Sequence, residues 1–251
     1  MKIESASLIE QEEMTKMVMM ISSCFLTKFW NFLRWFALLA VLLLFASVTT
    51  AQEEDFESWY SISTSRKVAS KITLLSEMEL RLNDNSTRFK KFQIDFGARY
   101  KFNKHFSSSI SYRYGRFNYY PYYYENENSI SIDLKADTKI DRFAVSFRTR
   151  LQEVFVNTDG VLISELISRN KAVVEYDIYQ SPFTPWVSYE VFIPVNYLSS
   201  SIFDKTRFFA GINYLLNKNN EISLFYGVQH NDTKREDKIS YILGLNYSIK
   251  F

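Results

Sequence analysis

Residues 92–102 read FQIDFGARYKF, and this stretch decides the fold class because its apolar and polar residues strictly alternate. Phe92, Ile94 and Phe96 begin a face that is apolar throughout, while Gln93 and Asp95 begin a face that is polar or glycine throughout. A period of two residues is typical of a β-strand whose two faces meet different environments. The stretch therefore predicts an all-β protein.

The same alternation recurs from residue 59 to the C-terminus and predicts about eleven strand segments. They are 59–65, 74–82, 92–102, 106–114, 130–134, 143–150, 172–178, 185–193, 208–216, 222–228 and 239–251. Such segments, separated by polar breaks, are typical of an antiparallel up-and-down transmembrane β-barrel. Because single-chain bacterial barrels have even strand counts, we expect 10 or 12 strands. Either 59–65 is an irregular lead-in, or a further strand lies around 161–167.

The spacers between the segments alternate in length. Tight spacers lie around 103–104, 139–141 and 217–220, and longer ones lie at 116–128, 156–169, 195–206 and 230–238. Short turns at one end and long loops at the other are typical of an outer-membrane barrel, with the short turns in the periplasm. This pattern places the C-terminus at the periplasmic end.

A secretory leader is predicted before the strands. Lys28 and Arg34 are followed by an apolar run over 35–48 and then by small residues up to Ala51. Positive, apolar and small residues in this order are typical of a signal peptide. The apolar run is shorter than the roughly 20 residues that a membrane-spanning helix needs.

We therefore expect a signal peptide over 1–51, with an uncertain start, and an outer-membrane β-barrel over 52–251. Cleavage is expected between Ala51 and Gln52. The alternatives are a permanent membrane anchor and lipidation at Cys24, the only cysteine in the chain. If the leader is removed, the mature barrel contains no disulfide.

The glycines indicate which face of the barrel points inward. Five of the six glycines lie on the polar face of their segments. These five are Gly97, Gly115, Gly211, Gly227 and Gly244. Glycine is expected where the concave interior of a narrow barrel leaves no room for a Cβ atom. The polar face is therefore predicted to face the lumen, and the apolar face is predicted to contact outer-membrane lipid.

The predicted lumen carries charges of both signs in equal number. The acids are Glu77, Glu79, Asp95, Asp133, Glu175, Asp177 and Glu190, and the bases are Arg81, Arg99, Arg113, Lys135, Arg148, Arg150 and Arg207. Opposite charges on neighbouring strands can form hydrogen-bonded pairs. We interpret the set as a structural ion-pair network in a narrow lumen. A selective pore is the alternative, although balanced charge indicates no ion preference.

Several short motifs resemble those of a known family. They are FESWY at 56–60, EMELRLND at 77–84, SYRY at 111–114 and LNYSIKF at 245–251. Together they resemble the domain of unknown function 2490 family, Bacteroidota proteins regarded as outer-membrane β-barrels. The resemblance implies a location in the bacterial outer membrane and a barrel fold, and it implies no activity.

The last residue, Phe251, shares a face with Tyr247 and Ile249. This aromatic C-terminus resembles the signal read by the barrel-assembly machinery, which would make that machinery a partner during biogenesis. A net charge of +2 gives no indication of nucleic-acid binding.

No catalytic residue, metal site or cofactor is predicted from the sequence. His105 and His230 are the only histidines, and we interpret both as surface residues near turns. His105 with Ser107 resembles the His-x-Ser pair of lipid A deacylase barrels, although its position beside a short turn argues against that role.

A tyrosine-rich stretch lies in the first long spacer. Its tyrosines are Tyr119, Tyr120, Tyr122, Tyr123 and Tyr124. Amphipathic rings often form the interfacial girdle of a membrane barrel. A surface that binds a glycan or another ligand by stacking is the alternative.

Taken together, these features predict an outer-membrane β-barrel of structural or passive-transport type with a charged, narrow lumen. A lipid-modifying enzyme and a surface ligand-binding barrel are the alternatives.

Overall fold

The structure is a computed structural model that describes residues 53–119, 123–158, 161–196, 203–233 and 236–251. The predicted signal peptide, including its cleavage pair Ala51 and Gln52, lies outside the described residues. In the part of the chain that is described, no helix is both long enough and apolar enough to span a membrane.

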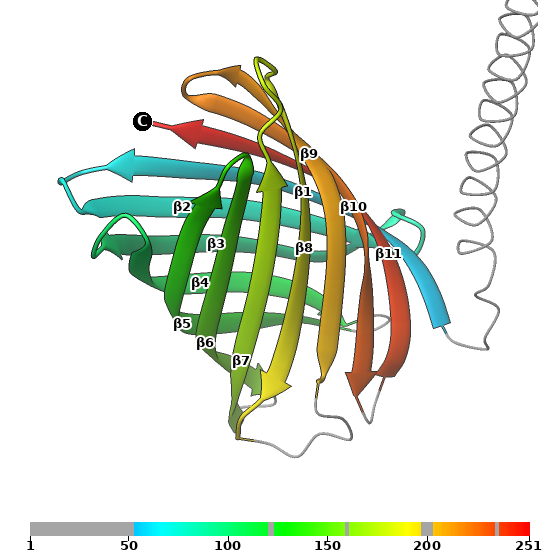
Figure 1. Ribbon diagram of the computed structural model, residues 1–251. Helices are drawn as coiled ribbons and strands as arrows, with labels where there is room; N and C mark the ends of the chain where they lie inside the picture. The colour runs from blue at the N-terminus through cyan, green and yellow to red at the C-terminus, as the bar shows by residue number, and fades with distance from the viewer. Residues whose placement is uncertain (1–52, 120–122, 159–160, 197–202, 234–235) are drawn as a thin grey trace, which may run out of the picture. The chain divides into compact units, whose positions relative to one another are not determined.

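The described residues form eleven strands that close into a single barrel (Figure 1). The strands are β1 (Glu53–Lys67), β2 (Ile72–Asn83), β3 (Arg88–Lys101), β4 (Phe106–Tyr119), β5 (Tyr123–Ile140), β6 (Phe143–Thr158), β7 (Val161–Tyr176), β8 (Phe183–Pro194), β9 (Lys205–Asn217), β10 (Asn220–Thr233) and β11 (Glu236–Lys250). Each strand pairs with the next in sequence, as an up-and-down barrel requires.

The expectation of 10 or 12 strands is wrong, because the described residues form eleven. Segment 59–65 belongs to the full-length strand β1, and 161–167 is the first half of β7. An odd count makes the first and last strands run in the same direction. β1 therefore pairs with β11 in parallel, whereas the ten consecutive pairs are antiparallel. Consequently β1 begins at the opposite rim from the C-terminus (Figure 1).

Three of the four predicted long spacers, 116–128, 156–169 and 230–238, are mostly strand, whereas β8 ends at Pro194 and β9 begins at Lys205, as the spacer at 195–206 predicted. β4 extends to Tyr119 and β5 begins at Tyr123, so only 120–122 separate them. β6 and β7 are separated only by 159–160, and β10 and β11 only by 234–235. Backbone hydrogen bonds between two strands can continue wherever a partner strand is present. The paired strands therefore extend beyond the alternating apolar residues that were used to predict the ends of the segments.

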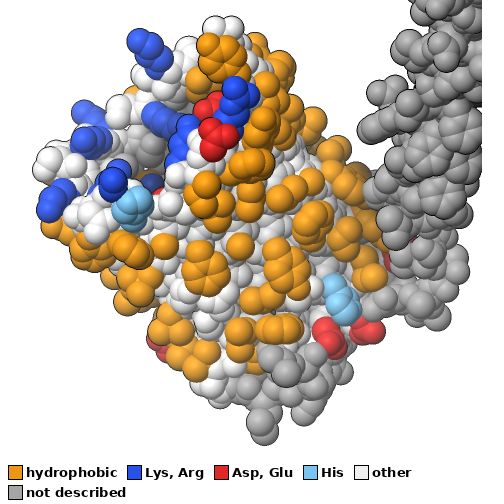
Figure 2. All heavy atoms as spheres, in the orientation of Figure 1, with side chains coloured by type: hydrophobic (Ala, Val, Ile, Leu, Met, Phe, Trp, Pro, Cys, Tyr) orange, Lys and Arg blue, Asp and Glu red, His pale blue; other side chains and the backbone are white. Residues whose placement is uncertain are grey.

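The barrel is apolar outside and mainly polar inside. Phe96, Ile110 and Leu134 are more than half exposed on the outer wall, whereas Gln93 and Glu190 are buried on the inner wall. Figure 2 shows apolar side chains spread over the outer face in view, with Lys and Arg side chains gathered at one rim. A water-soluble barrel has the reverse arrangement, with its apolar face inward.

Candidate functional site

The inner wall contains ion pairs between residues that lie directly opposite each other on neighbouring strands. Asp95 on β3 faces Arg113 on β4, and two guanidinium nitrogens of Arg113 donate to its carboxylate at 2.5 and 2.7 Å. Asp133 on β5 and Arg150 on β6 form the same two-pronged contact at 2.6 and 2.8 Å. Bidentate pairing fixes both position and orientation of the two groups.

The densest charge lies around Glu190 on β8. Its Oε1 accepts hydrogen bonds from Arg148 at 2.8 Å and from Arg169 at 2.9 Å. Its Oε2 lies 3.5 Å from a terminal nitrogen of Arg207. We call these four residues the Glu190 cluster. One buried carboxylate therefore holds three guanidinium groups from β6, β7 and β9.

A cavity of about 520 Å³ lies inside the barrel beside the Glu190 cluster. Nine of the predicted lumen residues line it: Glu77, Glu79, Arg81, Asp95, Arg113, Arg148, Arg150, Glu190 and Arg207. Arg81 donates to Glu79 on the same strand at 2.6 Å. The structure therefore brings together most of the residues that alternation placed in the lumen.

The other predicted lumen residues lie closer to the rim that carries the C-terminus, or beside the cavity. Asp133 is buried against Arg150, while Lys135 pairs with Asp137 at 2.7 Å. Glu175 lies opposite Trp186 in the β7–β8 register and so shares its inner face. Asp177 lies beyond the end of β7, where its exposed carboxylate pairs with Lys139.

Six charged residues that line this cavity were missing from the sequence prediction. They are Lys91, Glu127, Glu165, Arg169, Lys171 and Lys205. Each lies one to seven positions before the start of a predicted segment, because the observed strand begins earlier in the sequence than the segment does. Extending the alternating pattern towards the N-terminus of each segment would have identified them as inward-facing residues. With them, the cavity is lined by nine cationic side chains and six carboxylates, so its charge is not balanced.

Aromatic rings fill the inner wall formed by β1 and β8–β11. Trp59, Phe209 and Ile242 are buried together, with Trp186 and Phe225 packed against them. We call these five residues the ring cluster. The Phe209 ring lies 5.6 Å from that of Trp59 and 5.3 Å from that of Phe225, measured between centroids, in edge-to-face contact.

Two glycines make room for the ring cluster. A Cβ on Gly227 would lie 2.1 Å from the carbonyl oxygen of Phe208, and a Cβ on Gly244 would lie 2.0 Å from Cζ of Phe225. Both distances are far below van der Waals contact. Glycine therefore faces inward here because a neighbouring backbone or ring already occupies the space of a side chain.

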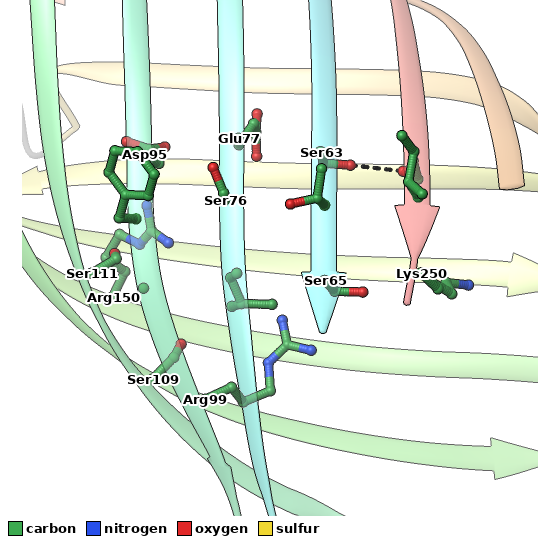
Figure 3. Close-up of a pocket in the computed structure, with 16 residues that line it drawn as sticks. Ser63, Ser65, Ser76, Glu77, Asp95, Arg99, Ser109, Ser111, Arg150 and Lys250 are labelled. Carbon is green, nitrogen blue, oxygen red and sulfur yellow. Dashed lines mark hydrogen bonds between the residues drawn. The ribbon is translucent and has the colours of Figure 1, made fainter. Parts of the chain in front are cut away.

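A second cavity of about 280 Å³ lies towards the rim that carries the C-terminus (Figure 3). Arg99 and Lys250 line it together with several serines, and Figure 3 shows Ser63, Ser65, Ser109 and Ser111 among them. The hydroxyls of Ser63 and Ser248 are 2.8 Å apart. Glu77, Asp95 and Arg150 line both cavities, so the two adjoin at this layer of charges.

Comparison with known families agrees with the motifs in the sequence. A family of proteins of unknown function, DUF2490, has a sequence model that matches residues 56–240. The chain belongs to the DUF2490 family. No curated protein matches its sequence.

Solved barrels are similar to this DUF2490 protein at low sequence identity. The porin NanC is 12% identical, with a TM-score of 0.48 over 73% of this chain and 92% of NanC. The β domain of the Bordetella autotransporter BrkA is 10% identical, with a TM-score of 0.46 over 66% of this chain and 80% of that one. A further porin is 14% identical, with a TM-score of 0.35 over 68% and 56% of the two chains.

The two histidines of this DUF2490 protein lie at opposite rims. Nδ1 of His105 is 2.9 Å from the carbonyl oxygen of Asp137, beside the turn between β3 and β4. Nε2 of His230 is 2.9 Å from Asp237 at the other rim. Among the described residues, no group of three or more His, Cys, Asp or Glu could hold a metal ion.

The remaining predicted residues lie on the surface or outside the described ranges. Phe251 is exposed, and its N–H donates to the carbonyl oxygen of Ser65. Tyr247 donates to Asn220 at 2.9 Å, and Ile249 is on the same outward row. Of the tyrosine-rich stretch, Tyr124 is exposed with its ring 5.1 Å from the Arg116 guanidinium, while Tyr120 and Tyr122 lie outside the described residues.

Proposed function

We propose that this protein is an outer-membrane β-barrel of passive-transport type with a narrow, charged lumen. The observation that carries the proposal is the distribution of side chains across the barrel wall. Large apolar residues are exposed around the outside, and charged residues are buried inside. Lipid is the environment in which such an outer surface is stable.

Energetics favour lipid over water for the outer wall. Leu134 is 60% exposed, and Phe96 and Ile110 are each above 55%. Soluble monomers rarely expose contiguous apolar patches larger than a few hundred Å². Inside a bilayer the same residues contact lipid chains and do not have to be buried against protein. The eleven described strands also close on one another without an unpaired sheet edge, as the hydrocarbon region requires.

Passive transport is supported by the two adjoining cavities in the interior. They share Glu77, Asp95 and Arg150, so together they extend along the lumen from the Glu190 cluster towards the C-terminal rim. Most of the residues that line each cavity are polar or charged, as a water-filled passage requires. A structural role alone does not call for such continuity.

Two isoleucines on the outer face of β5 test the location of the barrel in lipid. Ile132 lies at the middle of this strand and Ile140 at its end, and both are more than half exposed. In lipid vesicles, Ile132→Arg should destabilise the barrel by about 2–4 kcal/mol, whereas Ile140→Arg should cost about 0–1 kcal/mol. Urea unfolding measures both. Equal small effects would mean that the outer wall faces water.

Passage of solutes is tested by recording from the purified barrel in planar lipid bilayers. Discrete conductance steps are expected. Silence from correctly folded protein would contradict passive transport and would favour a purely structural barrel.

A further inference from the structure

We infer that the cationic side chains around Glu190 form an oxyanion-binding site that makes the lumen selective for small anionic solutes, an inference that rests on the proposed passive transport. The site lies on the inner faces of β6, β7, β8 and β9. Its ligand class is a solute with a carboxylate or phosphate group.

The charge around Glu190 is positive. The three guanidinium groups of the Glu190 cluster share one carboxylate. Lys171 lies directly opposite Glu190 in the β7–β8 register, and Lys205 is two residues from Arg207 on the same inward row. Three guanidinium groups therefore contact one carboxylate, and two ammonium groups occupy neighbouring inward positions. Like charges removed from bulk water are stabilised by an added counter-charge.

The site also offers unused hydrogen-bond donors. Nε of Arg148 is buried and has no hydrogen-bond partner among the described residues. Lys171 and Lys205 form no ion pair within the same part of the chain, and Nζ of Lys205 lies 5.4 Å from the Phe192 ring centroid. Guanidinium and ammonium donors form their strongest hydrogen bonds with oxyanions.

The site opens into a cavity large enough for a small solute. All five cations line the cavity of about 520 Å³, a volume in the usual range for small-molecule sites. The adjoining cavity brings Arg99 and Lys250 to the C-terminal rim. Cationic side chains therefore follow the route from that rim to the Glu190 cluster, and they would attract anions along it.

The decisive measurement is the reversal potential of the barrel in planar bilayers across a potassium chloride gradient. The wild-type protein should pass chloride more readily than potassium. The double variant Lys171→Gln/Lys205→Gln should shift the reversal potential towards zero, because it removes two cations without breaking an ion pair among the described residues. Glu165→Gln, which removes a carboxylate from the same cavity, should shift it in the opposite direction.

A matched control separates a local site from the overall charge of the protein. Lys104→Gln/Lys218→Gln also removes two lysines, but both are exposed in turns at the C-terminal rim. This control should leave the reversal potential unchanged. Cation preference in the wild type, or equal shifts in the two double variants, would overturn the anion site while leaving passive transport intact.

A second measurement decides the question if no conductance is seen, an outcome that contradicts passive transport itself. Trp59 and Trp186 are the only tryptophans after residue 51, and both line the cavity. In detergent-folded protein from which the leader has been removed, inorganic phosphate should change tryptophan emission, and acetate should do so if a carboxylate also binds. Both responses should be lost in Lys171→Gln/Lys205→Gln and kept in the control. No response in the wild type would overturn the site.

Discussion

The Glu190 cluster and the ring cluster line the same lumen, but different interactions hold them together. In the first, three arginines from different strands converge on one carboxylate. In the second, rings stack edge to face over positions where only glycine fits. The two meet where the Arg207 guanidinium lies 5.1 Å from the Trp59 ring. The stability of the charged region depends on ion pairing, and the stability of the ring-filled region depends on how well its side chains fit the available space.

The largest loss of stability is expected when the charged region loses its shared carboxylate. Glu190→Gln removes the shared carboxylate charge and leaves three guanidinium groups without their counter-charge in a buried position. Removing one partner of a buried ion network costs about 3–5 kcal/mol. Urea unfolding in lipid vesicles should show this loss. A loss below about 1 kcal/mol, typical of exposed pairs, would mean that solvent already screens the cluster.

An intermediate effect is expected when the ring-filled region is overpacked. Gly227→Ala and Gly244→Ala should each destabilise the barrel by about 1–3 kcal/mol, measured in the same way. The obstacle at Gly244 is the Phe225 ring, whereas the obstacles at Gly227 are the Phe208 carbonyl oxygen and the Phe209 ring.

A double-mutant cycle distinguishes these two obstacles. Phe225→Leu should recover more of the stability lost in Gly244→Ala than of that lost in Gly227→Ala, where the backbone oxygen of Phe208 stays in place. Equal recovery in both backgrounds would contradict the packing described for the ring cluster.

The smallest effect is expected at the rim, where charge is exposed. The side chains of Lys139 and Asp177 pair at 3.0 Å but are 60% and 61% exposed. Asp177→Asn should therefore change the free energy of unfolding by about 0–1 kcal/mol. Comparison with Glu190→Gln then measures what enclosure in the lumen adds. A loss as large as that of Glu190→Gln would show that burial is not the cause.

Much of the charged region could be predicted from the alternation of residues. Asp95 and Arg113 could be placed on inward rows because each lies on the polar face of a clear segment. Whether the two residues lie opposite each other depends on strand register. A period of two residues specifies only which face of the strand a residue is on. Arg169 and Lys171 were missed because they precede the apolar run from which their strand was identified.

The ring-filled region could be predicted only through its glycines. Phe209 and Phe225 lie on the inward, nominally polar rows, so their side chains break the alternation that identified the strands. Gly227 and Gly244 indicated a crowded interior, but the rings that crowd it come from neighbouring strands. Such contacts between strands are absent from the pattern of any single strand.

The amino-acid sequence by itself determined the strands, their apolar and polar faces and the inward position of the glycines, because these are local consequences of a two-residue period. The tertiary structure alone showed that all eleven segments belong to one barrel, that β1 closes on β11 in parallel and that the described residues give the central cavity an excess of positive charge. Closing the barrel fixes every register at once, and the registers decide which side chains share the enclosed space.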